Sequence, residues 1–455
     1  MAQTVVGTRV HEQAVDAVRA SYRALPAGTP VRLNKRTSNL FRPRPSAGTG
    51  AGLTVDGLDG VISIDESSRT ADVQGMCTYE QLIEVTLAHG LMPLVVPQLK
   101  TITLGGAVTG LGIESTSLRN GLPHESVLEI DVLTGSGEVV TATPEQHRDL
   151  FDAFPNSYGS LGYALRLRIR LEPVSPYVAM RHVRFHRLEE LTAAIATVAS
   201  TGAWDGERAD FVDGVMFSPT ESYLCLGSWC THGEPSDYTG QEIYFRSIKE
   251  RERDCLTVHD YLWRWDTDWF WCSAAFGAQH PVVRRLWPRR YRRSDVYHRM
   301  VDFENRYGLM ARINRRRGAP DRERVVQDVE LPLERVSEFL VWFDRCVGMS
   351  PVWLCPLQTH RSWPLYPLQP ERPYVNVGFW GTVAVPPGGR NGDVNRAIER
   401  AVARFDGHKS LYSDAYYDRD TFDAMYGGEV LRTVKKRYDP DDRFADMYDK
   451  VVGGR

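Results

Sequence analysis

The sequence predicts an α+β fold divided into more than one domain, and three observations support this. With 455 residues the chain is longer than one hydrophobic core usually serves, so two or three domains are expected. Short apolar or alternating segments, typical of strands, lie between amphipathic segments in residues 1–175. After Pro173 and Pro176 the elements become longer and richer in tryptophan and arginine. A change from one domain to another is therefore expected near residue 175.

The first domain is expected to begin with a helix over residues 11–25, where apolar side chains recur at helical spacing until Pro26. The segment Thr78-Tyr-Glu-Gln81 has the sequence of a capping box and predicts a helix through Leu87. A hairpin is expected around Gly135-Ser-Gly137, and a short helix over residues 145–151. Strands are predicted at residues 61–64, 71–74, 94–97, 127–133, 138–142 and 165–171, the last from strict alternation. Residues 31–39 are expected to form a short strand that runs into a polar loop.

The most informative stretch of this domain is Thr101-Ile-Thr-Leu-Gly-Gly-Ala-Val-Thr-Gly-Leu-Gly-Ile-Glu-Ser115, which contains four glycines. Glycine permits positive φ and lets the backbone approach a ligand without a Cβ in the way. Because successive backbone N–H groups can bind a phosphate, a dinucleotide site is one interpretation. A tight turn between core strands is the other, since Ser115 stands where a Rossmann fingerprint has its third glycine.

Composition and charge argue against several classes of function. A net charge of −3 does not suggest nucleic-acid binding, and 42% hydrophobic residues are typical of a soluble enzyme. No CxxC pair is present, so neither a disulfide framework nor a metal site is expected, and reduced thiols indicate a cytoplasmic protein. No signal peptide and no run of about 18 apolar residues is found, so we expect a soluble or peripheral protein. The cysteines are Cys77, Cys225, Cys230, Cys255, Cys272, Cys346 and Cys355.

The second part of the chain contains an unusual density of aromatic residues between Cys255 and Phe276. Rings of this size bury large areas, so the segment must line something apolar, either a domain core or a lipid-binding wall. Helices are predicted at residues 188–198, 394–405 and 420–425, with a Pro/Gly loop over residues 381–392. The aromatic residues are Tyr261, Trp263, Trp265, Trp269, Phe270 and Trp271.

Two arginine runs, Arg289–Arg293 and Arg315–Arg317, allow three interpretations. Most such runs are solvated faces. They could also bind the 2′-phosphate of a nicotinamide cofactor, or anionic lipid headgroups.

Taken together, these segments resemble the vanillyl-alcohol-oxidase type of FAD-binding oxidoreductase, with a PCMH-type flavin domain. The markers are Pro97, the phrase Thr103-Leu-Gly-Gly106, the turn Gly159-Ser-Leu-Gly162, and Tyr438-Asp-Pro440 followed by Phe444. The resemblance implies a flavin domain built from both ends of the chain around a central α/β cap. Its boundaries are expected at 1–175 for the flavin domain, 176–410 for the cap that binds substrate, and 411–455 for a C-terminal segment returning to the flavin domain.

Within that superfamily the chain is most similar to the Δ24-sterol reductase branch. The matching phrases are Gly112-Ile-Glu-Ser115, Val325-Val-Gln-Asp328, Pro351-Val-Trp-Leu-Cys-Pro356 and Leu411-Tyr-Ser-Asp414 with Tyr416. Members of this branch reduce an isolated carbon–carbon double bond in a lipid with FAD and a nicotinamide donor, NADPH or NADH. Bacterial relatives include reductases of methylene-branched fatty acyl chains. The membrane segment of the eukaryotic sterol enzymes is not found here, so membrane contact is expected to be peripheral.

The resemblance also implies which residues bind FAD. The first flavin loop, usually rich in glycine, is here Asn34-Lys-Arg-Thr-Ser-Asn39, and it offers no histidine or cysteine for a covalent link. We therefore expect non-covalent FAD. The implied residues are Lys35, Arg36, Thr37, Ser38, Asn39, Pro97, Thr101, Thr103, Leu104, Gly105, Gly106, Gly110, Gly112, Ile113, Glu114, Ser115, Gly159, Ser160, Gly162, Ile169 and Tyr438.

The implied reaction passes hydride from NAD(P)H through flavin N5 to one alkene carbon, while a protein acid protonates the other. An isolated alkene has no carbonyl group, so positive charge develops on carbon, and aromatic faces would stabilise it. Tyr261, Trp263, Trp265, Trp269 and Trp271 are the candidate substrate residues. The candidate acids are Tyr412, Tyr416, His259 and Glu114, although each could instead be structural, and His408 with Lys409 could neutralise flavin N1.

Two other functions are open at this stage. A sugar or alditol oxidase of the same superfamily would pass electrons to oxygen, although the aromatic segment argues against a polar substrate. A non-catalytic flavin or lipid carrier would keep the fold without the reaction. The residues do not separate a Δ24-sterol-like lipid from a methylene-branched fatty acyl chain, and we favour the acyl chain.

Overall fold

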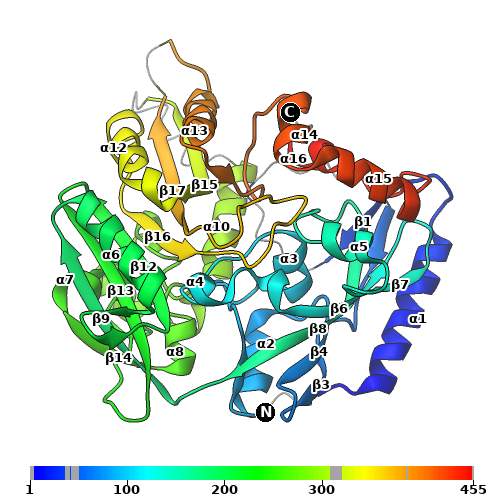
Figure 1. Ribbon diagram of the computed structural model, residues 1–455, viewed down its shortest axis with the longest axis horizontal. Coiled ribbons are helices and arrows are strands. Elements are labelled where there is room, and N and C mark those ends of the chain that lie inside the picture. Colours follow the sequence, from blue (N-terminus) through cyan, green and yellow to red (C-terminus); the bar gives the residue numbers. More distant parts are fainter. Residues whose placement is uncertain (1–4, 36–40, 42–50, 308–319, 386–387, 453–455) are drawn as a thin grey trace.

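The computed structural model describes residues 5–35, 41, 51–307, 320–385 and 388–452, and two large β-sheets organise this part of the chain (Figure 1). The strands of the first sheet all lie before residue 174, and those of the second lie between residues 177 and 409. The C-terminal helices, red in Figure 1, return to lie beside the first sheet's domain. The predicted α+β class is confirmed.

The first sheet has six strands, with β8 (Tyr163–Pro173) at its centre. Its apolar side chains point alternately into the core, while Arg166 on the other face pairs with Asp72 and Asp131 at 2.6 Å each. The predicted alternating strand is therefore confirmed. The sheet order is β3 (Val61–Asp65), β4 (Thr70–Gln74), β8, β6 (Val127–Leu133) and β7 (Val139–Ala142), with β5 (Leu91–Pro93) paired to β8.

Short helices and a two-stranded sheet surround this sheet. In α2 (Tyr79–Leu87), Thr78 and Gln81 form the predicted capping box, with the Gln81 N–H donating to Thr78 Oγ1 at 3.3 Å. The other elements are α1 (Thr8–Ala24), α3 (Leu104–Thr109), α4 (Ser117–Asn120), the 3-10 helix η1 (Pro123–Ser126), α5 (Arg148–Ala153), and the parallel strands β1 (Val31–Asn34) and β2 (Ala51–Thr54).

The second sheet has eight strands, all antiparallel to their neighbours. Their order is β14 (Arg253–Thr257), β9 (Tyr177–Phe185), β13 (Glu221–Cys230), β12 (Phe211–Ser218), β16 (Val352–Leu357), β17 (Tyr374–Ala384), β15 (Arg322–Pro332) and β18 (His408–Lys409).

Helices α6, α12 and α13 share a second hydrophobic core with the strands of this sheet. The elements of this part are α6 (Leu188–Thr201), β10 (Ala203–Trp204), β11 (Glu207–Arg208), α7 (Tyr244–Glu250), α8 (Val258–Leu262), η2 (Cys272–Phe276), α9 (Pro281–Leu286), η3 (Arg289–Tyr291), α10 (Ser294–Tyr307), η4 (Leu333–Arg335), α12 (Val336–Cys346) and α13 (Asp393–Arg404).

The C-terminal segment contains α14 (Arg419–Met425), α15 (Gly428–Tyr438) and α16 (Met447–Val451). It contacts the first domain at several points. The Tyr438 hydroxyl donates to Asp149 at 3.0 Å, the Val31 N–H donates to the Arg443 carbonyl at 2.7 Å, and Lys450 Nζ donates to the Gly159 carbonyl at 2.7 Å. Both ends of the chain thus build one unit beside a central second sheet. The exact boundaries at residues 175 and 410 stay a prediction.

Three sequence-based expectations are wrong in detail. The strand expected at residues 94–97 lies at β5, since Pro93 and Pro97 keep the intervening backbone out of the ladder. The helix expected at 145–151 begins at Arg148, because residues 143–146 form a turn closed by Thr143. The loop expected from residue 381 begins only after Ala384, since β17 continues in register with β15.

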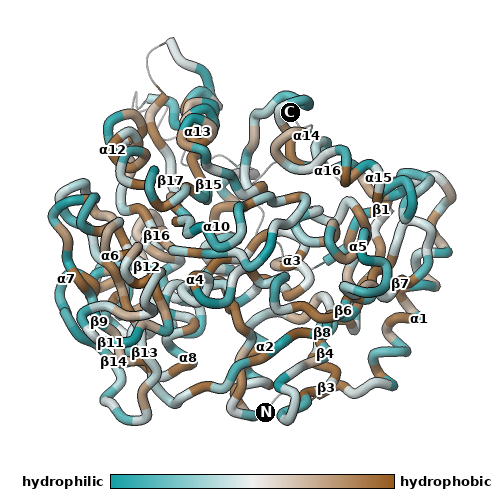
Figure 2. Tube along the Cα trace, viewed as in Figure 1, coloured by the Kyte–Doolittle hydropathy of each residue, from teal (hydrophilic) through white to brown (hydrophobic). Residues whose placement is uncertain are grey.

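In both sheets, the hydrophobic side chains of the strands point into the core. Figure 2 shows them along β3, β4 and β8, whereas α1 alternates between hydrophobic and hydrophilic positions. Among the described residues, no helix combines the length and apolar character needed to cross a membrane. All seven cysteines are free thiols.

Candidate functional site

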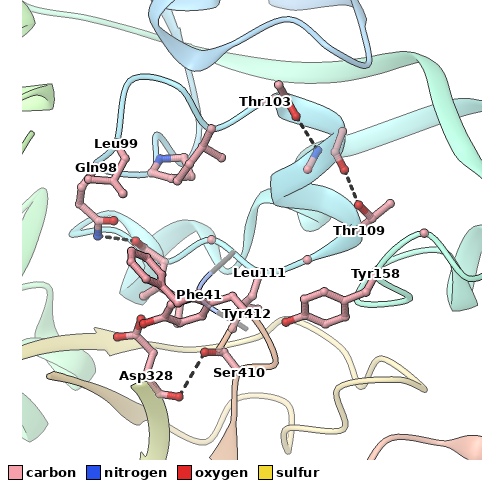
Figure 3. A pocket seen from close by; sticks show the side chains of 18 of the residues that line it. Phe41, Gln98, Leu99, Thr103, Thr109, Leu111, Tyr158, Asp328, Ser410 and Tyr412 are labelled. Carbon is pink, nitrogen blue, oxygen red and sulfur yellow. Dashed lines mark hydrogen bonds between the residues drawn. The ribbon is translucent and has the colours of Figure 1, made fainter. Parts of the chain in front are cut away.

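A cavity of about 380 Å³ lies between the glycine stretch and the strands of the second sheet (Figure 3). It is lined from the first domain, from β15, β16 and β17, and from the C-terminal segment, so every major part of the fold contributes. The lining residues are Leu33, Lys35, Phe41, Met76, Pro97, Gln98, Leu99, Ile102, Thr103, Gly105, Gly106, Thr109, Gly110, Leu111, Gly112, Ile113, Tyr158, Gly159, Tyr163, Ala164, Trp269, Phe270, Asp328, Trp353, Asn376, Trp380, Ser410, Tyr412 and Lys450.

The glycine stretch forms one wall through α3 and the residues after it. Thr103 caps α3, with its Oγ1 accepting from the Gly106 N–H at 3.1 Å. The expectation of positive φ is wrong, because none of the four glycines adopts it. Their role is close packing instead. A Cβ on Gly105 would lie 2.6 Å from the Gly75 carbonyl oxygen, and one on Gly112 would lie 2.8 Å from Pro97.

Replacing Gly105 by alanine is therefore expected to lower the free energy of unfolding by about 1–3 kcal/mol, since the new methyl group meets backbone that cannot move away. Thermal or denaturant unfolding of the holoprotein measures this. Gly381→Ala is the matched control, because its Cβ would meet only the flexible end of Met349, at 3.1 Å. Equal stability of the two variants would contradict this packing role.

Two lysines give this side of the cavity positive charge. The Lys450 ammonium donates to the carbonyls of Gly159 at 2.7 Å and Tyr158 at 3.3 Å. Lys35 follows β1, and its Nζ would be 3.9 Å from a Cβ on Gly106. Ammonium groups beside glycine backbone that lines the cavity suit a phosphate group.

The other side of the cavity is aromatic. Phe41 stacks on Trp269 with ring centroids 5.6 Å apart. Phe270 packs between Trp380 at 4.3 Å and Trp353 at 5.4 Å. Flat apolar faces of this kind bind rings and hydrocarbon.

A polar group stands within this aromatic side. The Tyr412 hydroxyl accepts a hydrogen bond from Trp380 Nε1 at 2.8 Å and bonds to the Asp328 carboxyl group. Burial raises the pKa of Asp328 to about 6, and hydrogen bonds from Asn376 and Tyr412 oppose this. Burial also raises the pKa of Tyr412, so its hydroxyl keeps its proton.

The strand opposite Asp328 makes room for this group. Gly378 pairs with Asp328 across β15 and β17, and a Cβ there would lie 2.5 Å from the carboxylate. Asn376 Nδ2 donates to Asp328 at 2.9 Å, and Asn376 Oδ1 is buried with no partner among the described residues. An acceptor without a partner at a cavity wall indicates a missing ligand donor.

Several residues implied for FAD do line the cavity: Lys35, Pro97, Thr103, Gly105, Gly106, Gly110, Gly112, Ile113 and Gly159. Others do not. Leu104 and Ile169 are core residues, Ser115 accepts from Tyr261, and Tyr438 bonds to Asp149. Thr101, Ser160 and Gly162 also lie outside the lining. Arg36, Thr37, Ser38 and Asn39 lie outside the described residues.

Glu114 is buried away from the cavity in a charge cluster. Arg264 lies 2.7 Å from Glu114 and 2.9 Å from Asp213, and the indole N–H groups of Trp265 and Trp353 also donate to Asp213 at 2.9 and 3.1 Å. Burial raises the pKa of Glu114, with Arg264 opposing. This cluster joins the glycine stretch to the aromatic segment and to the second sheet.

Some of the remaining predicted substrate residues and proton donors line the cavity, and others do not. Of the predicted aromatic substrate residues, Trp269 lines the cavity together with Phe270, while Tyr261, Trp263, Trp265 and Trp271 are buried elsewhere. His259 is 44% exposed beside Glu84 and Asp260.

Tyr416 packs against Arg396 at 4.4 Å and does not reach the cavity. His408 is buried between Tyr366 and Tyr426, and Lys409 pairs with Glu399 at 2.7 Å, so neither lines the cavity.

Sequence reasoning missed four groups of this site: Asp328, Asn376, Trp380 and Lys450. Asp328 carried no distinct signal, because Glu323, Gln327 and Glu330 are also polar residues of the same strand. The other three come together only through strand register and the return of the C-terminus.

The arrangement fits FAD. The lysines and glycine backbone match its pyrophosphate, the aromatic faces match its ring system, and Asn376 offers an acceptor to a ring N–H. Lys35, Lys450, Gly106 and Gly110 would hold the phosphate side, and Trp269, Trp380 and Asn376 the side where the ring reacts.

Comparison with known proteins agrees with this fit. Residues 2–143 match a family model described as an FAD binding domain. The chain is 25% identical to Delta(24)-sterol reductase of Homo sapiens over 407 residues, covering 86% of this chain and 76% of that protein. It is 24% identical to Delta(24)-sterol reductase of Arabidopsis thaliana over 444 residues, covering 87% and 75%.

A third relative matches a shorter part of the chain. Cytokinin dehydrogenase 2 of Oryza sativa subsp. japonica is 34% identical over 152 residues, covering 33% of this chain and 25% of that protein. The likeness to the sterol reductases, by contrast, covers 86% and 87% of this chain. The front part of the chain therefore carries an FAD binding domain, and most of the chain is similar to the Delta(24)-sterol reductases.

Proposed function

We propose that this protein reduces an isolated carbon–carbon double bond in a lipid, with electrons from NADPH or NADH. The observation that carries the proposal is the Tyr412–Asp328 pair, a proton donor set within an aromatic wall. Relatives that bear the name Delta(24)-sterol reductase support a lipid alkene as substrate. A methylene-branched fatty acyl chain is our preferred substrate, and a Δ24-sterol-like lipid is the alternative.

Lys35, Lys450 and Asn376 would hold FAD in this cavity, and the bound cofactor would supply hydride chemistry between a nicotinamide and carbon. The protein must supply the proton. Trp380 donates to the Tyr412 oxygen, which fixes the phenol and directs its O–H away from the indole. When Asp328 is protonated it can return a proton to Tyr412 after Tyr412 has protonated the alkene. Tyr412 is thus the proposed donor, and Asp328 its proton reservoir.

The aromatic side would serve the positive charge that develops on the substituted alkene carbon. The faces of Trp269, Phe270 and Trp380 are electron-rich and lie beside the donor. They also exclude water, which would otherwise solvate and quench that charge.

This role predicts a pH dependence. Because the pKa of Asp328 is raised to about 6, the rate of alkene reduction should fall as the pH rises through 6. Asp328→Asn should remove that limb of the pH–rate profile. Asp328 also binds its proton more tightly in the folded state, so its contribution to the free energy of unfolding declines as the pH rises from about 4 through 6. A limb that persists in Asp328→Asn would contradict this assignment.

The proposal is tested under argon. The purified protein should be yellow, NADPH should bleach it, and a methylene-branched acyl lipid should restore the colour. A sugar or alditol oxidase would instead release peroxide when polyols are added in air. A flavin or lipid carrier would hold FAD that no nicotinamide reduces. Either of those results would overturn the reductase proposal.

A further inference from the structure

Large apolar side chains are exposed in one region more than in any other described part of the chain. Nine such residues are exposed, and six of them lie between residues 282 and 307. Leu286 is 78% exposed, Val282 61% and Phe303 55%. We call this set the α9–α10 face; it consists of Val282, Val283, Leu286, Tyr291, Phe303 and Tyr307.

The short helix α9 buries a charged side chain and exposes apolar ones, the reverse of what is usual for a surface helix. Of its two arginines, Arg284 is buried, pairing with Asp268 at 2.7 Å and donating to the carbonyls of Gly240 and Glu242, while Arg285 is exposed. Val282 and Leu286, on the same helix, point into solvent. Arg292, which follows Tyr291 in the sequence, is likewise buried and donates to backbone carbonyls. The buried contacts of Arg284 and Arg292 fix the orientation of this segment, so its apolar side chains stay exposed to solvent.

The surroundings of α9 and η3 are cationic, whereas α10 bears Asp302, which is 64% exposed and pairs with His298. Arg285 and Arg290 are exposed, and neither makes an ion pair with a described residue. Arg289 is 65% exposed, although it pairs with Asp237 at 2.9 Å. This local charge contrasts with the net charge of −3 of the whole chain. Apolar side chains among arginines match the acyl boundary and the headgroups of an anionic bilayer.

The face is also connected to the cavity. On α10, His298 packs against Phe41 at 5.0 Å and against Trp269 at 5.9 Å, and both of these rings line the cavity. Phe303 and Tyr307 lie further along the same helix, with ring centroids 4.6 Å apart. One helix therefore contacts the aromatic side of the cavity and bears part of the exposed face.

We propose that the α9–α10 face docks on the surface of a lipid bilayer that contains anionic headgroups. The apolar side chains enter the acyl boundary, and Arg285, Arg289 and Arg290 contact the headgroups. The inference goes beyond the proposed reaction, because it names a partner surface and rests on exposure and charge alone.

Sedimentation with vesicles tests this on the full-length holoprotein. The protein should bind vesicles of equal parts phosphatidylglycerol and phosphatidylcholine at least about tenfold more tightly than phosphatidylcholine alone. Leu286→Asp should weaken binding to the mixed vesicles about tenfold or more, and Arg285→Glu with Arg290→Glu should abolish the preference for phosphatidylglycerol. Val430→Asp is the matched control, since Val430 is an exposed apolar residue on α15, and it should bind like the parent protein.

Three results would overturn the inference. The first is a parent protein that does not bind the mixed vesicles, and the second is equal loss in Val430→Asp and Leu286→Asp. The third is a parent protein that forms dimers in solution which Leu286→Asp dissociates, since a second copy would then cover the face. Flavin absorbance and circular dichroism confirm that each variant is folded. Vesicle binding needs no turnover, so its failure leaves the reductase proposal untouched, and the reverse also holds.

Discussion

Replacing Tyr412 by phenylalanine is expected to slow alkene reduction by about 100-fold or more, while NADPH still bleaches the bound flavin at the parent rate. The substitution removes only the hydroxyl that Trp380 and Asp328 hold at the cavity wall. No proton is needed from that hydroxyl when the flavin is reduced, so the two half-reactions should separate. Stopped-flow absorbance under argon measures each of them.

Tyr416→Phe is the matched control for this experiment. Tyr416 lies four residues away and was an equal candidate from the sequence, but it packs on Arg396 outside the cavity. Both half-reactions should be unchanged in this variant. Unchanged turnover in Tyr412→Phe, or an equal loss in Tyr416→Phe, would remove Tyr412 as the proton donor.

Replacing Arg264 by methionine should lower the free energy of unfolding by about 3–5 kcal/mol. Arg264 is the cation between Glu114 and Asp213, and all three side chains are at most 3% exposed. Its loss leaves two buried carboxylates facing each other without a positive partner. Denaturant unfolding at neutral pH measures the change.

The pH dependence of this variant provides a second readout. Burial already raises the pKa of Glu114, and loss of Arg264 should raise it further, so the folded variant binds a proton that the unfolded chain releases. Its stability should therefore fall as the pH rises, and the defect should be smaller at pH 5 than at pH 8. Arg253→Met is the control, because its pair with Glu207 is exposed and should contribute little to the free energy of unfolding. Equal effects of the two substitutions would contradict the buried cluster.

Sequence patterns predict those helices and strands that depend on interactions between residues close in sequence. The capping box at Thr78 and the alternation in β8 each depend on residues close in sequence, and both are confirmed. The glycine stretch is expected from the sequence to let the backbone approach a ligand, and in the fold Gly105 approaches the Gly75 backbone while Gly112 approaches proline rings. Which neighbour a glycine meets depends on distant segments, here Gly75 and Pro123.

The site itself was less predictable for the same reason. Tyr412 could be chosen from the sequence, but its partners Trp380 and Asp328 reach it through the register of β15 with β17 and the path of the C-terminal segment. Glu114 belongs to the glycine stretch, yet it pairs with Arg264 in the buried charge cluster and does not line the cavity. A sequence shows that such residues are present, whereas only the fold decides which of them meet.

The central claim is tested most directly by a single turnover under argon. The holoprotein is first bleached with one equivalent of NADPH and then mixed with a methylene-branched acyl lipid, and the lipid is analysed by mass spectrometry. We predict that the yellow colour returns in step with a product heavier by two hydrogen atoms, in an amount equal to the flavin. Return of the colour only after oxygen is admitted, with the lipid unchanged and a Δ24-sterol equally inert, would contradict the account.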